Sequence, residues 1–144
     1  MGYEHPSRES IKTILQNAST IAVVGLSGSP ERTSYMVAQA MQAKGYRIVP
    51  VNPNVETVLG EQSYATLRDI PFKIDVVNVF RRSQHAVHIA KQAVEIGAGT
   101  LWLQLGVLSE KAAELAAEGG LQVVMDRCIK VEDAILLTEG KPKL

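Results

Sequence analysis

The stretch from Ile21 to Arg32 constrains the fold more than any other part of the chain. Residues 21–24 are all apolar, without the alternation of a half-exposed strand, so they are typical of a strand that is covered on both faces. The turn that follows contains Gly25 and Gly28, and helical spacing begins after Arg32. A strand, a glycine-rich turn and a helix in this order predict a unit that holds a phosphate-bearing nucleotide.

Length and composition indicate one domain with one site. A chain of 144 residues buries roughly two-thirds of its unfolded surface, which is enough for a sizeable core. Fifteen acidic residues balance fifteen basic ones, and 46% of the residues are hydrophobic, so the composition favours neither disorder nor nucleic-acid binding. We expect a single domain over residues 1–144, with an N-terminal helix at about residues 7–18 and a nucleotide-binding core at about residues 20–137.

The sequence carries no signal for export or membrane insertion. No stretch approaches the roughly twenty apolar residues needed to cross a bilayer. Cys128 is the single cysteine, which excludes an internal disulfide and a multi-cysteine metal site. We therefore expect a soluble, cytoplasmic protein without a membrane partner.

The order of elements along the chain alternates strands with helices. Ser7, Ser83 and Ser109 are expected to cap helices, and the first helix is expected to pack on the sheet edge or cover its end. Pro50 predicts an edge position or a bulge for the second strand. The segment from about residue 58 to 71 is too broken for a long helix, so a short strand or extended excursion and a turn are expected. Strands are predicted at residues 21–24, 47–51, 74–80, 100–104 and 121–125, with a last helix at about residues 131–137 and a frayed tail at 139–144.

This alternation predicts an α/β fold, a Rossmann-like doubly wound parallel sheet with helices on both faces. Among the five main strands the expected order is 3-2-1-4-5. Ligands would then bind beyond the carboxyl ends of the strands, at the switch point between the first and fourth strands. The loops that begin at Gly25, Asn52, Phe80, Gln104 and Asp126 meet at that edge.

The first of these loops matches the dinucleotide fingerprint only in part. Gly25 permits a tight turn, and Gly28 lets the backbone pass close to a bound group. Ser27 and Ser29 add hydroxyl donors. Ser27 and Pro30 stand where Gly-x-Gly-x-x-Gly has its other glycines, so the loop alone leaves open a turn without a ligand.

Two further loops favour a phosphate-rich ligand over NAD. An NAD site has an acidic residue at the end of the second strand, whereas this chain has Asn52-Pro53, which also suits a simple turn. Arg81 and Arg82 follow the third strand, and with Arg32 they offer three guanidiniums to phosphate oxygens. A solvated charge pair is the alternative interpretation.

Seven motifs occur in order along the chain: Gly25-Leu26-Ser27 with Pro30-x-Arg32-x-Ser34, Gly45-Tyr46-x-x-x-Pro50-Val51-Asn52-Pro53, Leu59-Gly60-Glu61, Asp75-x-Val77, Phe80-Arg81-Arg82, Trp102-Leu103-Gln104-Leu105-Gly106 and Asp126-Arg127-Cys128. Together they resemble the bacterial stand-alone CoA-binding protein family. That family is similar to the CoA-binding N-terminal domain of the succinyl-CoA synthetase α subunit. The resemblance extends from about Thr20 to Asp133.

The resemblance implies that CoA or acyl-CoA is the ligand. We expect its pyrophosphate over the loop of residues 25–29 and the following helix, with Arg32 beside it and one or both of Arg81 and Arg82 on phosphate. Asn52 and Pro53 would border the adenosine. The implied binding residues are Gly25, Leu26, Ser27, Gly28, Ser29, Arg32, Asn52, Pro53, Phe80, Arg81, Arg82, Gln104 and Gly106.

We expect no catalytic and no metal-binding residues. In the synthetase a second domain supplies the phosphohistidine chemistry, and this chain is expected to end after the first. His85 and His88 are expected at the surface, and Asp75 as a structural carboxylate. Cys128 is either an inert packed thiol or a group that forms a mixed disulfide with pantetheine under oxidising conditions.

The leading interpretation is therefore non-catalytic binding of CoA or acyl-CoA. An NAD(P)-linked oxidoreductase or nicotinamide-nucleotide sensor is the alternative, and an interaction domain that has lost its ligand is a third. An edge strand at residues 47–51 and the apolar segment 134–137 would suit a homo-oligomer or a partner protein.

Overall fold

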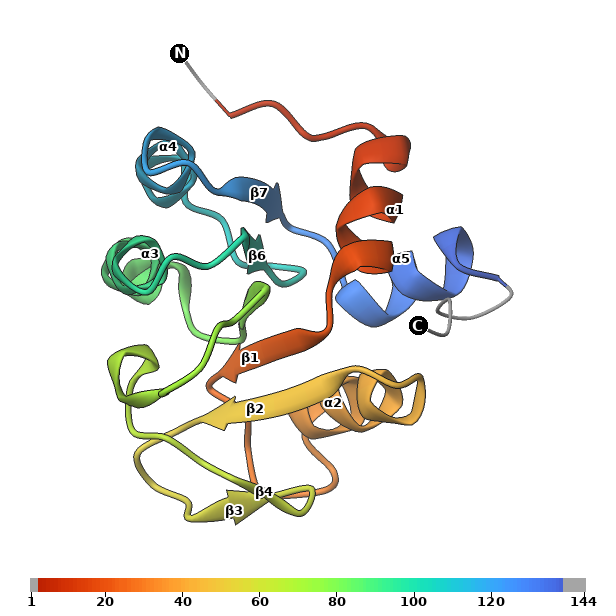
Figure 1. The fold of residues 1–144 in the computed structure, drawn as a ribbon, viewed down its shortest axis with the longest axis vertical. Coiled ribbons are helices and arrows are strands. Elements are labelled where there is room, and N and C mark those ends of the chain that lie inside the picture. The colour runs from red at the N-terminus through yellow and green to blue at the C-terminus, as the bar shows by residue number, and fades with distance from the viewer. Residues whose placement is uncertain (1–2, 139–144) are drawn as a thin grey trace.

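Five parallel strands form the central sheet of the computed structural model, which describes residues 3–138 (Figure 1). Their order across the sheet is β2-β1-β5-β6-β7. This arrangement confirms the predicted Rossmann-like α/β class. The strands are β1 (Thr20–Val24), β2 (Arg47–Val51), β5 (Val76–Val79), β6 (Thr100–Leu103) and β7 (Gln122–Met125).

Helices cover both faces of this sheet, as predicted. Figure 1 shows α3 and α4 on one face and α1, α2 and α5 on the other. The helices are α1 (Arg8–Asn17), α2 (Thr33–Ala43), α3 (Ala86–Glu95), α4 (Glu110–Glu118) and α5 (Ile129–Leu136), with short 3₁₀ turns η1 (Leu67–Asp69) and η2 (Ser83–His85).

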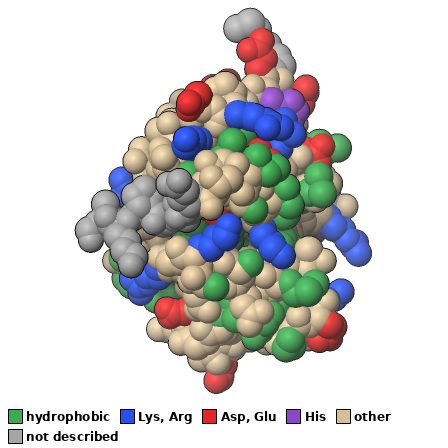
Figure 2. Space-filling view, turned by 90° about the vertical axis from the view of Figure 1, so that its right-hand side faces the viewer, with side chains coloured by type: hydrophobic (Ala, Val, Ile, Leu, Met, Phe, Trp, Pro, Cys, Tyr) green, Lys and Arg blue, Asp and Glu red, His purple; other side chains and the backbone are tan. Residues whose placement is uncertain are grey.

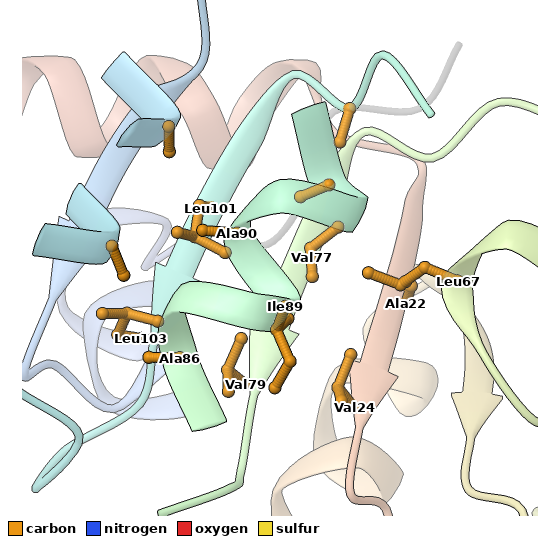
Figure 3. Close-up of a cluster of buried hydrophobic side chains, with 14 of the residues drawn as sticks. Ala22, Val24, Leu67, Val77, Val79, Ala86, Ile89, Ala90, Leu101 and Leu103 are labelled. Atoms are coloured by element: carbon orange, nitrogen blue, oxygen red, sulfur yellow. The ribbon is translucent and has the colours of Figure 1, made fainter. Parts of the chain in front are cut away.

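Each central strand contributes alternate side chains to two separate cores. In β1, Ala22 and Val24 lie in the core beneath α3 and α4 (Figure 3). Ile21 and Val23 point into the other core, which α1, α2 and α5 cover. Helix α1 thus buries its apolar side against a face of the sheet, so the prediction that it packs on the edge or end is wrong.

The predicted strand order is wrong in one respect. β5 pairs with β1, not with β2, so the order in chain numbering is 2-1-3-4-5. The outer edge of β2 is covered instead by the chain that follows it, where the Tyr64 N–H donates to the Pro50 carbonyl at 3.0 Å and the Tyr64 carbonyl accepts from Asn52 N–H at 2.9 Å. The chain therefore crosses to the far side of β1, and the switch point lies between β1 and β5.

The segment that covers β2 is the short excursion expected from the sequence. It contains a two-stranded antiparallel hairpin, β3 (Thr57–Val58) and β4 (Glu61–Gln62), followed by η1. Within the five-stranded sheet β2 is an edge strand, as Pro50 predicts.

Two of the three predicted serine caps are present. The Ser7 hydroxyl accepts from Ser10 N–H and the Ser109 hydroxyl accepts from Ala112 N–H. The Ser83 hydroxyl instead accepts from Leu108 N–H at 2.8 Å, and so joins the loops after β5 and β6. The last helix begins at Ile129, slightly earlier than predicted, and the tail 139–144 lies outside the described residues.

A buried carboxylate fixes α5 to the chain between α2 and β2. Asp133 is 1% exposed, and it accepts hydrogen bonds from Lys44 Nζ and from the Tyr46 hydroxyl, each at 2.6 Å. Burial, together with the hydrogen bond to Asp133, raises the pKa of Tyr46 well above its ordinary value. The interaction holds the helix that follows the β7 loop.

Charges on the face formed by α1, α2 and α5 are mixed. Figure 2 shows acidic and basic side chains interspersed over it instead of gathered into one patch of a single sign. Within residues 3–138 no helix is long and apolar enough to span a membrane.

Candidate functional site

Two adjoining cavities lie along the carboxyl ends of the strands. The first has a volume of about 700 Å³ and the second about 450 Å³, and Arg81 lines both. The first lies over β1 and β2 and is lined by Gly25, Ser27, Gly28, Ser29, Arg32, Val51, Asn52, Pro53, Asn54, Val55 and Arg81. The second lies over β5 and β6 and is lined by Thr33, Phe80, Arg81, Arg82, Gln104, Leu105, Gly106, Val107 and Cys128.

Gly25 is required by the way β1 ends. Its φ is +88°, in the left-handed region that favours glycine. A β-carbon there would lie 2.8 Å from the Phe80 carbonyl oxygen and 2.9 Å from Arg81 Cδ. Glycine thus lets the loop after β1 pack directly on the end of β5.

Gly28 has a different setting. A β-carbon at this position would stand 3.5 Å from Val55 Cγ1, which is ordinary van der Waals contact. The protein's own packing therefore does not demand glycine here. Gly28 is exposed and lines the first cavity, so a side chain would extend into the space that a ligand would fill.

Hydrogen bonds within the chain hold the loop after β1 in shape. The Ser34 hydroxyl accepts from Ser27 N–H, and the Ser27 hydroxyl oxygen accepts from Ser29 N–H, both at 3.0 Å. These two amides are therefore engaged. No hydrogen bond among residues 3–138 uses the Gly28 amide, and Gly28 lines the first cavity.

Helix α2 points its amino end at both cavities. No side chain caps the helix at Arg32. Arg32 lines the first cavity and Thr33 the second. The unpaired N–H groups of a first helical turn carry a partial positive charge, so this end of α2 favours an anion.

The Asn52 side chain joins two of the loops. Its Nδ2 donates to the Leu26 carbonyl at 3.0 Å, and its Oδ1 accepts from Asn54 N–H at 2.9 Å. The amide thus makes the local turn contacts that the sequence left as an alternative, and Asn52 lines the first cavity beside Pro53. Leu26 is fully buried in the core beneath α2, so the prediction that it belongs to the binding surface is wrong for its side chain.

The three predicted arginines divide between the cavities. Arg32 and Arg81 line the first cavity, whereas Arg82 lines the second beside Arg81. All three are exposed, and within the described part of the chain none of them forms a salt bridge with a carboxylate. Two guanidiniums, not three, are therefore available to one anion in the first cavity.

The loop after β6 is held by the loop after β7. Gly106 has a φ of +89°, and its N–H donates to Asp126 Oδ1 at 2.7 Å. Asp126 itself has a φ of +59°, an uncommon conformation for a residue other than glycine. Trp102 Nε1 adds a hydrogen bond of 2.9 Å to the Arg127 carbonyl. These contacts hold the wall of the second cavity.

Several lining residues were not predicted. Asn54 and Val55 follow Asn52-Pro53 directly, so their place beside a predicted strand end was a usable signal. The same holds for Leu105 and Val107 beside Gln104 and for Thr33 beside Arg32.

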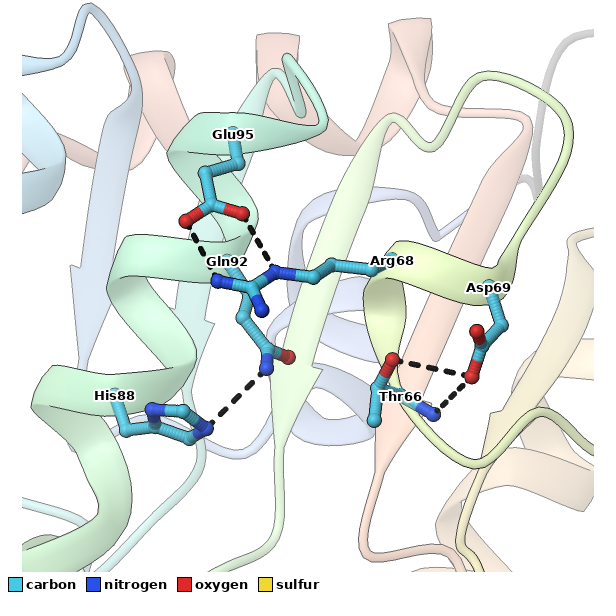
Figure 4. A network of polar contacts seen from close by, with 6 residues as sticks. All are labelled: Thr66, Arg68, Asp69, His88, Gln92 and Glu95. Atoms are coloured by element: carbon cyan, nitrogen blue, oxygen red, sulfur yellow. Dashed lines mark hydrogen bonds and ion pairs between the residues drawn. The ribbon is translucent and has the colours of Figure 1, made fainter.

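The remaining reactive groups lie mainly outside these cavities. His88 is exposed on α3, where Nε2 lies 3.2 Å from Gln92 Nε2 (Figure 4), and His85 belongs to η2. The Asp75 carboxylate accepts from Ser19 N–H at 2.8 Å and Thr20 N–H at 3.0 Å, a structural role as predicted. Over residues 3–138 no group of three or more His, Cys, Asp or Glu side chains is placed to hold a metal ion.

Comparison with known proteins identifies the family to which the chain belongs. Residues 19–134 match the family described as a CoA binding domain. The chain is 46% identical over 132 residues to "Uncharacterized protein YneT" of Bacillus subtilis (strain 168), an alignment that covers 92% of this chain and 98% of that protein.

Solved structures share the fold. A hypothetical protein from Pyrococcus horikoshii OT3 is similar with a TM-score of 0.89 and 36% identity, over 95% of this chain and 99% of that one. The dinucleotide forming acetyl-coenzyme A synthetase 1 of Ca. Korarchaeum cryptofilum is similar with a TM-score of 0.68 over 78% of this chain and 27% of that one. At 22% identity the second likeness shows the fold alone.

Proposed function

Because this chain belongs to the CoA binding domain family, we propose that it binds CoA or an acyl-CoA along the carboxyl edge of its sheet, as a binding module without catalysis of its own. One observation carries this assignment above the others. Arg81 joins a polar cavity, which Arg32 also lines, to a second cavity that Arg82 also lines but whose lining is more apolar. CoA has the matching division, since a phosphorylated adenosine diphosphate continues into a long, uncharged pantetheine arm.

The phosphates of CoA fit the first cavity. Arg32 and Arg81 supply charge-assisted hydrogen-bond donors, and the Gly28 amide adds a neutral donor. The uncapped amino end of α2 adds a positive dipole to the same place. We assign the pyrophosphate to this position, between the loop after β1 and α2, with the adenosine beside Asn52 and Pro53.

The pantetheine arm fits the second cavity. The carboxyl ends of β2 and β6 are three strands apart, or roughly 14 Å at about 4.8 Å for each strand spacing. An extended arm that leaves the pyrophosphate at Gly25 and passes Arg81 enters the space beside Phe80, Gln104 and Cys128. The thiol or thioester would lie there.

Binding without catalysis is the role that these lining groups suit. They are amides, hydroxyls, guanidiniums, apolar side chains and the Cys128 thiol, which bind and orient a ligand. A free thiol in this position also suits a reducing compartment, and we propose the cytoplasm.

The nicotinamide alternative has less support from the first cavity. An NAD site uses a carboxylate at the end of the second strand to accept from the ribose hydroxyls. None of the described residues that line this cavity is acidic, and the Asn52 amide is already bonded to Leu26 and Asn54.

Thermal unfolding in the presence of candidate ligands separates these functions. A ligand that binds only the folded state raises the melting temperature. We expect CoA and acetyl-CoA to raise it, while NAD and NADP at equal concentrations leave it unchanged. Stabilisation by NAD or NADP and not by CoA would replace this proposal with the nicotinamide site, and no response to any of them would favour an interaction domain without a nucleotide.

A further inference from the structure

We propose that the side-chain amide nitrogen of Gln104 donates a hydrogen bond to a carbonyl oxygen at the pantetheine–thioester end of the ligand, an assignment that rests on the CoA binding proposed above. This contact would fix how deeply the arm enters the second cavity. The acceptor is either an amide carbonyl of pantetheine or the carbonyl of an acyl thioester, since both are neutral acceptors on the same arm.

Gln104 is nearly buried, yet it lines the cavity. It follows β6, and its residue is 5% exposed. Its Oε1 accepts from Asn78 Nδ2 and from Ile129 N–H, each at 3.2 Å. The oxygen of the amide is therefore fully engaged within the protein, by a strand on one side and by the first residue of α5 on the other.

These contacts also determine which atom of the amide is oxygen. A backbone N–H can only donate, so the Gln104 atom that faces Ile129 must be the acceptor. Asn78 Nδ2 is identified in the same way, because it also lies 3.4 Å from the Trp102 carbonyl. Asn78 Nδ2 thus donates to both the Trp102 carbonyl and Gln104 Oε1, and the two assignments agree.

The nitrogen of Gln104 is left without a partner. No hydrogen bond among residues 3–138 uses its Nε2. Among the described residues Arg127 Nε is the only side-chain nitrogen or oxygen that is both fully buried and unpartnered, so Gln104 Nε2 stays open to solvent. A ligand carbonyl in the cavity that Gln104 lines would accept from this nitrogen in place of water.

A carbonyl suits this position better than a phosphate. Phe80, Val107 and Leu105 give this end of the cavity apolar walls, and the donor is an uncharged amide. Arg32 lines only the first cavity, whereas Arg81 lines both and Arg82 lines the second, so the choice of a carbonyl rests on the uncharged donor and the apolar walls around Gln104. An uncharged acceptor costs less to place among apolar groups than an anion does.

Calorimetric titration of Gln104→Glu tests this assignment. The substitution retains an oxygen toward Asn78 and Ile129 and replaces the NH₂ group, so the internal contacts can persist. Gln104→Met removes both donors without adding a charge and serves as the second variant. Gln122→Glu is the matched control, because Gln122 is an exposed residue of β7 outside both cavities.

Four ligands separate the sources of the carbonyl: adenosine 3′,5′-bisphosphate, which lacks the arm; CoA; S-ethyl-CoA, which has no thioester carbonyl; and acetyl-CoA. We expect both Gln104 variants to weaken acetyl-CoA about tenfold, as loss of one buried hydrogen bond does, and to retain adenosine bisphosphate binding. Equal weakening of CoA, S-ethyl-CoA and acetyl-CoA identifies a pantetheine amide, whereas weakening of acetyl-CoA alone identifies the thioester.

Unchanged affinity of the Gln104 variants for all four ligands would overturn the assignment. A loss of affinity for adenosine 3′,5′-bisphosphate as large as the loss for acetyl-CoA would also overturn it, because this ligand lacks the arm that Gln104 is proposed to contact. Failure of the wild-type protein to bind CoA would instead contradict the proposed function itself. Gln122→Glu is expected to bind every ligand as the wild type does.

Discussion

Gly25 and Arg81 are packed so closely that a β-carbon on Gly25 would lie 2.9 Å from Arg81 Cδ. The first residue of the loop after β1 is thus in contact with the arginine that lines both cavities. The same contact joins β1 to β5, the strands on either side of the switch point.

Gly25→Ala is expected to lower both stability and CoA affinity. A left-handed φ at alanine costs about 1–2 kcal/mol, and the contact with the Phe80 carbonyl adds to this. Gly60→Ala is the matched control, because Gly60 has a φ of +77° with nothing within 4 Å of a β-carbon. Chemical unfolding should show the larger loss for Gly25→Ala, and calorimetry should show weaker CoA binding for this variant alone. Equal behaviour of the two variants would contradict the role given to Gly25.

Arg81→Ala is expected to weaken adenosine 3′,5′-bisphosphate and CoA by about 10–100-fold, since hydrogen bonds to charged groups contribute about 1.5–3 kcal/mol. Arg82→Ala should affect the bisphosphate less, because Arg82 lines only the second cavity. Arg68→Ala is the control, since Arg68 pairs with Glu95 on the exposed surface of α3 (Figure 4). A larger effect from Arg82 than from Arg81 would contradict this placement of the phosphates.

The double substitution of Arg81 and Arg82 by alanine tests which phosphate the arginines meet. Weaker binding of CoA with little change for dephospho-CoA would assign them to the 3′-phosphate. Equal loss for the two ligands would rule out that contact and leave the pyrophosphate as their partner. Titration at two salt concentrations should show the arginine contribution decreasing as salt rises.

The reactivity of the Cys128 thiol tests where the pantetheine arm of CoA lies. This partly exposed thiol lines the second cavity, so CoA should slow its alkylation by iodoacetamide, and adenosine 3′,5′-bisphosphate should not. Mass spectrometry of the intact protein measures the rate, with Cys128→Ser as the unreactive control. Equal rates with and without CoA would place the arm elsewhere.

Tyr46 is expected to make stability decline in alkaline solution. Because burial and Asp133 raise its pKa above the ordinary 10.0, the folded protein keeps the phenol proton at pH values where the unfolded chain loses it. The unfolded chain then binds fewer protons, so the free energy of unfolding falls as the pH rises, by up to about 1.4 kcal/mol per pH unit. Below about pH 9 the Tyr46 phenol is protonated in both the folded and the unfolded state, so its full contribution to stability is present there.

Urea unfolding of wild type and Tyr46→Phe from about pH 8 to pH 11 isolates this effect. The stability difference between the two proteins should shrink as the pH rises. A difference that stays constant would show that Tyr46 has an ordinary pKa in the folded state.

The strands were predictable from sequence, but one strand pairing was not. Unbroken apolar runs such as residues 21–24 mark buried strands wherever they lie in the sheet. The side on which β5 pairs depends on the chain around Tyr64, which covers the outer edge of β2 through hydrogen bonds to Pro50 and Asn52. Backbone contacts of this kind have no side-chain pattern to reveal them.

The place of the site was predictable, whereas the roles of single side chains were not. Carboxyl ends of parallel strands meet at one edge in either strand order, so the loops at Gly25, Phe80 and Gln104 come together as expected. Leu26 is an example of a role that was not predictable, because an apolar residue next to a binding loop can equally well pack into the core, as Leu26 does. Ser83 likewise bonds to Leu108 N–H in a neighbouring loop, where local sequence predicts a helix cap.

Calorimetric titration of CoA into the wild-type protein tests the central claim most directly. We expect saturable binding at one site per chain, with NAD and NADP failing to compete. Absence of heat and of saturation with CoA, or displacement of CoA by NAD at comparable concentration, would contradict the account.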